Sequence, residues 1–324
     1  MKIAITGGAG FIGRKLARAL LDDNAMGVEH ISLVDMVDPP ADLLDDARID
    51  AITGDVTDED LLAQAIRPDT DAVFHLAAVV SAGAEADFDL GMAVNLDATR
   101  TILDIARRHG TTPKIVFASS CAAYGGDLPE VVTDNQQLTP QNSYGIQKAI
   151  GELLINDYSR KGFIDGRALR YPTVVVRPGK PNKAASTFAS SIIREPLQGQ
   201  GAVCPVTPET AMWLASPRTI VANTKRAHDL PAEAWGPWRA VALPGFTITV
   251  GEMVAALEAI AGPEVAARVR WERDPAIEKI VYGWPSRFET THADAMGFAR
   301  DAGMEPVIRA FIEDELGGVI PGAA

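Results

Sequence analysis

The chain has 324 residues, which is enough to bury a large core, and its 47% hydrophobic and 23% charged residues exclude an intrinsically disordered protein. The formal net charge of −13 argues against nucleic acid and against an anionic membrane as partners, because both would be repelled. The two cysteines, Cys121 and Cys204, lack the spacing of metal ligands and the number of a disulfide framework, so we expect no metal site and a reducing cytoplasm.

No targeting or membrane segment is expected. An apolar run starts at residue 2, which leaves no room for a signal peptide. No stretch of about 18 or more apolar residues is present that would span a bilayer. The sequence therefore predicts a cytosolic protein.

A glycine-rich turn follows the first apolar run, Lys2 to Thr6, and precedes a helical pattern. The glycines are spaced as GxxGxxG: Gly7 permits the turn, Gly10 lets the backbone approach a pyrophosphate, and Gly13 allows the helix to pack closely. The helix start, with Phe11 and Ile12, supplies amide donors for an anion. This segment predicts a dinucleotide site, although glycine-rich turns alone are common.

The second apolar run, Ile31 to Asp35, ends in a carboxylate. Asp35 is placed to accept both ribose hydroxyls of an adenosine, and its charge would repel a 2′-phosphate, which favours NAD over NADP. Two alternatives stay open. Arg14 or Lys15 could reach a phosphate, and Asp35 could be a plain cap of its strand.

Apolar runs alternate with helical patterns along the first half. Further strands are expected at 51–53, 72–75, 114–118 and 168–171, and helices at 61–66, 90–108 and 144–160. Such alternation predicts an α/β fold with a doubly wound parallel sheet and ligands at the carboxyl ends of its strands. We expect a dinucleotide-binding domain at 1–170 with a return segment near 213–230, and a smaller, mainly substrate-binding region at 171–324 that includes a helix at 250–261.

Polar and small residues follow the expected strands. Asp55, next to Val56, is placed to bind the adenine amino group, and Leu76, Ala77 and Ala78 would let backbone lie along the cofactor. His75 precedes them on a buried run, so we interpret it as a hydrogen-bonded core histidine and not as a catalyst.

Tyr144 and Lys148 are four residues apart on an expected helix, so both side chains can point into one site. A phenol is a poor base at neutral pH, and a nearby cation lowers the cost of the phenolate, so we expect Lys148 to lower the pKa of Tyr144. Taken alone, the pair would more often be two residues on a solvated helix face.

Together these pieces resemble the extended short-chain dehydrogenase/reductase family over the whole chain, the family of NAD-dependent epimerases and dehydratases. The matching segments are 6–13, 54–58 and 75–78, Asn95, Ser119-Ser120 with Tyr124-Gly125, and Tyr144 with Lys148. The resemblance implies a Rossmann sheet that binds NAD, Tyr144 as acid/base, Lys148 on the nicotinamide ribose, and Ser120 as donor to the reacting oxygen. It also implies a homodimer through paired helices. We expect Asn95 and Ser119 to be structural neighbours of this site.

Two departures from the family pattern narrow the reaction. Residues 119–124 lack the Asp-Glu pair known in dehydratases, so dehydration is not expected. Residues 170–186, with 194–200 after them, lack the Asn-containing Gly-Pro motif of nucleotide-sugar epimerases and resemble a branch that oxidises the 2-hydroxyl of a small, erythronate-like sugar acid with NAD. In that branch, the segment from Tyr171 to Thr173 should line the nicotinamide.

A small anionic polyhydroxy acid needs a charged partner for its carboxylate, preferably an arginine fork. Six basic residues are candidates: Arg177, Lys180, Lys183, Arg194, Arg218 and Arg287. Arg177 and Lys180 follow the nicotinamide loop and are preferred, with Ser81 as a hydroxyl partner. Most of the six are expected to be ordinary surface charges.

Three functions are compatible with these motifs. The first is a dehydrogenase for a small sugar acid, in which Tyr144 takes the hydroxyl proton and Ser120 steadies the oxygen. The second is a nucleotide-sugar 4-epimerase that keeps its NAD, and it would use the same three residues. A dinucleotide-sensing regulator would not need the three together, so it ranks last.

Overall fold

The computed structural model describes residues 1–179 and 184–321 of the chain. It separates into two compact units, each made of several chain segments. Unit 1 comprises residues 1–123, 140–171 and 221–242, and unit 2 comprises residues 124–139, 172–220 and 243–324. The sequence predicts one dinucleotide-binding domain and one mainly substrate-binding region, and this functional division stays a prediction.

Unit 1 is built on one sheet, which has seven strands within the described residues. Its order is β10-β6-β5-β4-β1-β2-β3, and every neighbouring pair is parallel. The strands are β1 Lys2–Thr6, β2 His30–Asp35, β3 Ile49–Thr53, β4 Ala72–His75, β5 Lys114–Ser120, β6 Asp165–Tyr171 and β10 Ala240–Ala242. The strand order reverses between β1 and β4, the place where doubly wound sheets bind their ligands. The predicted doubly wound parallel sheet is therefore confirmed.

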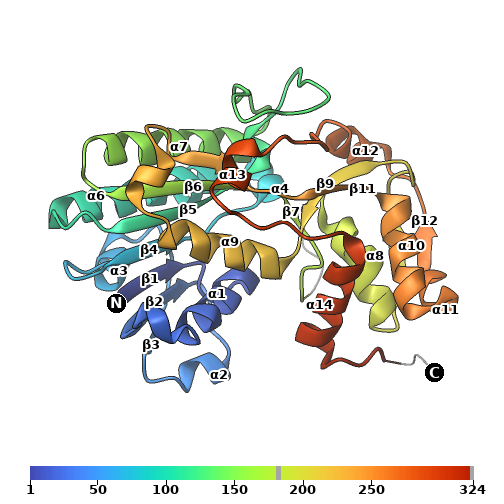
Figure 1. The fold of residues 1–324 in the computed structure, drawn as a ribbon, viewed down its shortest axis with the longest axis horizontal. Helices are drawn as coiled ribbons and strands as arrows, with labels where there is room; N and C mark the ends of the chain where they lie inside the picture. The colour runs from blue at the N-terminus through green and yellow to red at the C-terminus, as the bar shows by residue number, and fades with distance from the viewer. Residues whose placement is uncertain (180–183, 322–324) are drawn as a thin grey trace. The chain divides into compact units, whose positions relative to one another are not determined.

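Helices cover both faces of this sheet (Figure 1). On one face α3, α6 and α7 pack over a shared core with β4 and β5, while α1 and the unit 1 part of α9 lie on the other. The helices are α1 Phe11–Leu21, α2 Ala41–Leu44, α3 Glu59–Ala65, α4 Ser81–Ala86, α5 Phe88–Gly91, α6 Ala98–His109, α7 Ser143–Arg160 and α9 Pro217–Asp229. Short 3₁₀ turns lie at Asn24–Met26, Cys121–Ala123 and Ala232–Trp235. Helices on both faces explain why the central strands read as continuous apolar runs.

The single helix expected at 90–108 is wrong in detail. The chain forms α5, then a π-helical segment at Met92–Asp97, and then α6. The extra residue in a π turn breaks the 3.6-residue period without ending the helical path, so hydrophobic periodicity does not reveal it. Such turns are frequent at functional sites, and this one carries Asn95.

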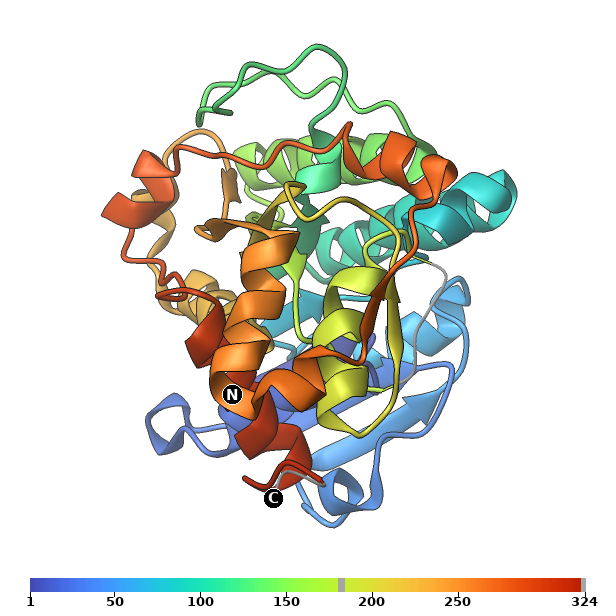
Figure 2. The same ribbon diagram turned by 90° about the vertical axis from the view of Figure 1, so that its right-hand side faces the viewer.

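Unit 2 combines two small sheets with three packed helices. Figure 2 shows α8, α10 and α14 side by side, and their buried faces share one apolar core. The sheets have the orders β11-β9-β7 and β12-β8. The strands are β7 Thr173–Val174, β8 Ala202–Cys204, β9 Ala211–Ala215, β11 Phe246–Thr249 and β12 Val269–Trp271. The helices are α8 Thr187–Leu197, α10 Val250–Ala261, α11 Pro263–Ala266, α12 Pro275–Val281, α13 Thr291–Ala295 and α14 Met304–Leu316.

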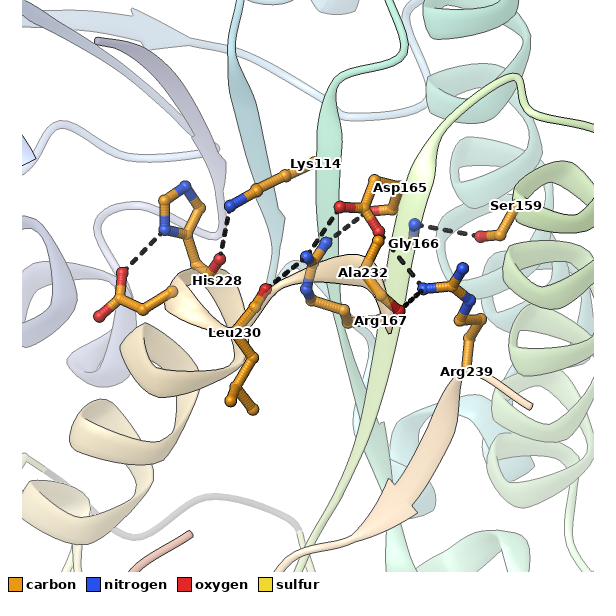
Figure 3. Close-up of polar contacts among 10 residues, drawn as sticks. Lys114, Ser159, Asp165, Gly166, Arg167, His228, Leu230, Ala232 and Arg239 are labelled. Carbon is orange, nitrogen blue, oxygen red and sulfur yellow. Dashed lines mark hydrogen bonds and ion pairs between the residues drawn. The ribbon is translucent and has the colours of Figure 1, made fainter. Parts of the chain in front are cut away.

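The return segment 221–242 is fastened to the start of β6 by charged side chains (Figure 3). The fully buried Arg167 donates to Asp165 at 2.8 Å and to the Leu230 carbonyl at 2.9 Å. Its guanidinium carbon lies 5.8 Å from the ring centre of Trp235, and Arg239 reaches Asp165 at 3.4 Å. These bonds hold the segment that supplies β10, the edge strand paired with β6.

Candidate active site

The turn after β1 has the geometry expected for a dinucleotide site. Gly7 adopts φ +72°, and its amide donates to the Val34 carbonyl at 2.8 Å. A Cβ on Gly13 would lie 2.2 Å from the Gly7 carbonyl oxygen, so only glycine lets α1 come this close. The predicted packing role of Gly13 is confirmed.

The N-terminus of α1 is open to an anion. Gly10, its N-cap, supplies no side-chain acceptor for the first-turn amides, and the first turn contains no acidic residue. The amides at Phe11, Ile12 and Gly13 are donors at the positive end of an 11-residue helix. This set of donors fits a pyrophosphate.

Asp35 lies at the end of β2, as the sequence predicts. Its hydrogen bond with the Ala9 amide was not predicted. Its Oδ2 accepts the Ala9 amide at 3.0 Å and its Oδ1 accepts the Met36 amide at 2.8 Å. Each carboxylate oxygen keeps a further lone pair for a ribose hydroxyl. After β3, Asp55 is exposed and accepts the Thr57 amide at 2.9 Å, while Val56 is buried.

His75 is a core histidine, as predicted. Its Nδ1 lies 2.6 Å from the Thr6 hydroxyl and its Nε2 lies 2.9 Å from the Thr99 hydroxyl. Burial lowers the pKa of the imidazole to about 3, and the charge of Lys148 lowers it further. The ring is therefore neutral at physiological pH.

The segment after β4 runs along the glycine turn. The Leu76 amide donates to the Thr6 carbonyl at 3.0 Å, and a Cβ on Gly7 would lie 2.8 Å from the Ala77 nitrogen. Leu76, Ala77 and Ala78 are half-buried, and Ser81 begins α4. The structure thus brings this segment and the glycine turn together.

Asn95 fixes the same segment from the π-helical turn. Its Oδ1 accepts the Val79 amide at 2.9 Å, and its Nδ2 donates to the Val79 carbonyl at 3.0 Å and to Gln147 at 2.7 Å. Asn95 is buried, so it shapes the site from behind. The predicted structural role is confirmed, whereas Gln147, which precedes Lys148, was missed.

Ser120 and Tyr144 are brought together by the close approach of α7 to the 3₁₀ turn that follows β5. A Cβ on Gly145 would lie 2.1 Å from the Ala122 carbonyl oxygen, so glycine permits this approach. The Ser120 hydroxyl is hydrogen-bonded to the Tyr144 phenol, which lowers the phenol's pKa, but burial outweighs the bond and raises that pKa to about 12. The net pKa of the phenol therefore lies above its ordinary value, because desolvation of the phenolate is the largest effect. The lowering expected from Lys148 stays a prediction.

Lys148 lies on the same face of α7 and is 1% exposed. Its Nζ is 4.6 Å from the ring centre of Phe117 and 5.6 Å from that of Tyr144. Burial lowers the pKa of its ammonium to about 7, while Glu152, one turn further along α7, raises it. The aromatic faces and Glu152 offset part of the desolvation of the cation.

Behind these residues lies a buried ion pair that we did not predict. Arg170 on β6 donates from Nε to Glu152 Oε1 at 3.0 Å and from Nη2 to Oε2 at 2.6 Å. Ser119 donates to the same carboxylate, which confirms its structural role. Cys121 points its thiol toward the Arg170 carbonyl at 3.8 Å, and burial raises the thiol pKa to about 12. A carboxylate four residues after Lys148 was the only sign of this network in the sequence.

Tyr171 and Thr173 lie on the two sides of the boundary between the units. The Tyr171 hydroxyl is 2.6 Å from the Thr224 hydroxyl on α9, and burial raises the pKa of its phenol. Thr173 belongs to β7 and pairs with Leu214 of β9. Their predicted contact with a nicotinamide stays a prediction.

The basic candidates for the substrate carboxylate differ in their partners. Arg177 is half-buried, and its guanidinium lies beside two hydroxyls of the described residues, with Nε 3.4 Å from Ser190 and Nη2 3.3 Å from Ser186. Burial and the neighbouring Arg194 both lower its pKa. Among the described residues, no carboxylate lies within ion-pair distance of Arg177.

The other described candidates are already paired. Arg194 forms an ion pair with Glu195 at 2.6 Å, and its Nη1 donates to the Arg177 carbonyl at 2.7 Å. Arg218 is exposed and bonded to Asp314, and Arg287 is exposed and bonded to Glu130. Lys180 and Lys183 lie outside the described residues.

The described residues contain neither a cluster suited to a metal ion nor a helix suited to span a membrane. No cluster of three or more His, Cys, Asp and Glu side chains there is arranged to hold a metal ion. In the same residues, every helix is too short or too polar to cross a bilayer.

The chain is similar to known proteins over nearly its whole length. The NAD dependent epimerase/dehydratase family matches residues 3–213. A D-erythronate dehydrogenase of Cupriavidus necator is 54% identical over 97% of this chain and 98% of its own, and one of Haemophilus influenzae is 47% identical over 98% and 100%. A solved structure described as a nucleoside-diphosphate-sugar epimerase from Agrobacterium tumefaciens is 43% identical, with a TM-score of 0.92 over 99% of this chain and 96% of its own. The chain is therefore an NAD-dependent enzyme and belongs to the NAD dependent epimerase/dehydratase family, within the extended short-chain dehydrogenases/reductases.

Proposed function

We propose that the enzyme oxidises the 2-hydroxyl of a small sugar acid, D-erythronate or a close homologue, to the 2-oxo acid, with NAD as the hydride acceptor. Two relatives that match nearly the whole chain, at 54% and 47% identity, are D-erythronate dehydrogenases. The observation that carries the proposal is Arg177, a half-buried guanidinium held by hydroxyls and lacking a carboxylate partner among the described residues.

Arg177 suits a carboxylate for reasons of charge. Arg194 and Glu195 neutralise each other, so the group formed with Arg177 keeps one positive charge. A buried charge without a counter-charge is costly, and a substrate carboxylate would supply the missing one through a bidentate fork. We propose Lys180 and Ser81 as further substrate contacts.

NAD is proposed to bind unit 1 along the carboxyl ends of its strands. The α1 amides and Gly10 would hold the pyrophosphate, Asp35 the adenosine ribose, and Asp55 with Val56 the adenine. The segment Leu76–Ala78, backed by Asn95, would lie along the cofactor. Lys148 and Tyr144 would contact the nicotinamide ribose, and Tyr171 with Thr173 the ring.

The proton is proposed to leave through Tyr144. The substrate hydroxyl would bind between Ser120 and Tyr144, and Ser120 would hold the oxygen while Tyr144 accepts its proton. The nicotinamide, when bound, accepts the hydride from C2 and contributes a positive charge. Lys148 adds a second positive charge near the phenol. Both charges oppose the desolvation that raises the pKa of Tyr144 to about 12.

A nucleotide-sugar epimerase is the second candidate, and the solved structure at 43% identity favours it through its description. The same three residues would then oxidise and re-reduce one carbon. A nucleoside diphosphate needs partners for two phosphates. Arg194, Arg218 and Arg287 are committed to carboxylates of the chain, which favours the sugar acid.

The deciding experiment measures NADH formation with a panel of four- to six-carbon sugar acids beside a panel of nucleotide sugars. The proposal predicts stoichiometric NADH with a sugar acid. Epimer formation from a nucleotide sugar without net NADH, and no turnover of any acid, would establish the second candidate instead.

We also propose a cytoplasmic homodimer formed through α7. Ile146 and Leu153 are exposed by 45% and 57% and lie seven residues apart on α7. Phe88 and Leu90 near the start of α5 are exposed by 59% and 44%. Light scattering should give twice the chain mass for the wild type and a monomer for Leu153→Glu, and a monomeric wild type would contradict the proposal.

A further inference from the structure

The carboxylate of Glu152 is the meeting point of three elements in unit 1. It comes from α7 and accepts hydrogen bonds from Ser119 on β5 and from Arg170 on β6. Ser119 and Arg170 face each other in the parallel register of these strands. Glu152 is 1% exposed, Ser119 2% and Arg170 3%, so water reaches none of them freely.

Stability alone does not account for a charged group at this place. The desolvation of a buried ion pair cancels much of its attraction, and apolar replacements of similar volume are often as stable. What such a pair does provide is a fixed charge and a fixed geometry. The residues next to Glu152 indicate which groups this fixed charge and this fixed geometry affect.

Each residue of the network adjoins a proposed site residue. Glu152 follows Lys148 by one helical turn, Ser119 precedes Ser120, and Arg170 precedes Tyr171. The register pairs Ser120 with Tyr171 directly. The network therefore fixes the two strand ends and the helix that together carry the reacting groups.

The charge of Glu152 also matters for Lys148. Next to Lys148, α7 presents Tyr144 and Glu152, β4 presents the neutral His75, and β5 presents the ring of Phe117. Arg170 of β6 is bonded to Glu152, and the Cys121 thiol points toward the Arg170 carbonyl. Glu152 is the carboxylate of this group, and the pKa of Lys148 stands at about 7 even with its help. Without Glu152, burial and the unbalanced Arg170 would both favour the neutral amine.

We propose that Glu152, held by Arg170 and Ser119, is a positioning residue that keeps Lys148 an ammonium and sets the strand end that carries Ser120. The inference rests on the proposed roles of Tyr144 and Lys148. According to this inference, the reaction also needs the negative charge of Glu152, one helical turn after Lys148, and the hydrogen bond that Ser119 donates to Glu152.

The test is the pH profile of kcat for the full-length enzyme with NAD and its sugar acid. Glu152→Gln should shift the basic limb to lower pH by about one unit or more, which is about a tenfold loss of kcat above that limb. KM for NAD should stay within about twofold, since Glu152 is not itself a proposed contact of the dinucleotide and a neutral Lys148 amine still donates a hydrogen bond to the ribose. Glu258→Gln, the same change on the exposed face of α10, should leave the profile unchanged.

Three further variants separate charge from packing. Glu152→Asp keeps the charge, so it should retain the wild-type limb even where kcat falls. The double variant Glu152→Gln with Arg170→Met removes the pair without leaving an unbalanced cation. The basic limb of the double variant should stay shifted to lower pH. A return to the wild-type profile would show that the ion pair is merely structural and would overturn the inference.

If Glu152→Gln does not fold, Ser119→Ala is the alternative test. This variant should lower kcat at unchanged KM for NAD, and an unchanged kcat would overturn the inference.

Tyr144→Phe, assayed in parallel, keeps two kinds of failure apart. Full activity of that variant would remove the proposed function and this inference together. An inactive Tyr144→Phe beside a Glu152→Gln variant with the wild-type limb would remove this inference alone.

Discussion

The amide of Ala9 donates a hydrogen bond to the Asp35 carboxylate at 3.0 Å. The side chain proposed to select NAD thus also fastens the glycine turn to the end of β2. Cofactor choice and turn geometry are coupled through one residue, and two substitutions separate them.

Asp35→Asn should relax the preference for NAD over NADP, because it removes the charge that repels a 2′-phosphate and keeps an acceptor for the Ala9 amide. Asp35→Ala loses both and should in addition weaken NAD binding by about tenfold, the equivalent of a lost charge-assisted bond. The measurement is kcat/KM for both cofactors with each variant. An unchanged ratio in both variants would place cofactor choice elsewhere.

Tyr144→Phe removes the phenol hydroxyl and keeps the ring beside Lys148. We expect kcat to fall by about 10²–10⁴-fold, the usual contribution of a general acid or base. The dissociation constant of NADH, measured by fluorescence, should stay within about twofold, as expected when only a transition-state contact is lost. Substantial turnover would exclude Tyr144 as the group that moves the proton.

Arg177→Gln should raise KM for the sugar acid by about 100-fold, the loss expected for a buried bidentate pair with a carboxylate. KM for NAD should hardly change. Arg287→Gln is the matched control, because Arg287 is exposed and already bonded to Glu130. Equal effects of the two variants on KM for the acid would contradict the role of Arg177.

The buried, neutral ring of His75 should make the stability of the fold sensitive to acid. The pKa of the ring is about 3 in the folded state, below the ordinary histidine value of 6.5 that applies to the unfolded chain, so the unfolded chain binds the extra proton between these limits. The free energy of unfolding should therefore fall as pH drops through this window, by about 1.4 kcal/mol per unit from this one group.

His75→Gln, which does not titrate, should flatten that slope, even though the loss of the ring lowers stability near neutrality. His292→Gln, at an exposed position on α13, is the control and should keep the wild-type slope. Denaturant unfolding at several pH values measures both. A wild-type slope in His75→Gln would assign the acid sensitivity to other groups.

The sequence predicted the parts of the fold where periodicity is strong and local. The strand, turn and helix around Gly7–Gly13 and the long helix that carries Tyr144 were found because their patterns are complete within about 20 residues. The small strands of unit 2 were not predicted. β7 has two residues and β8 and β12 have three each, which is too short for alternation to be visible.

The residues proposed for the site were predicted by type and position, but their energetics were not. Nothing in the spacing of Tyr144 and Lys148 shows that burial would raise one pKa and lower the other. The partner of Glu152 depends on the register that places Arg170 opposite Ser119, a long-range property of the sheet. Tertiary burial and strand register are the information that local patterns lack.

The polar contacts between the start of β6 and the return segment 221–242, shown in Figure 3, limit where the chain can be divided into fragments. A fragment ending at Tyr171 would lose β10 and leave β6 as a bare edge, with Arg167 deprived of the Leu230 carbonyl. An unprotected edge strand invites pairing with another chain. Chimeras with related enzymes should therefore exchange residues 1–123, 140–171 and 221–242 as a set.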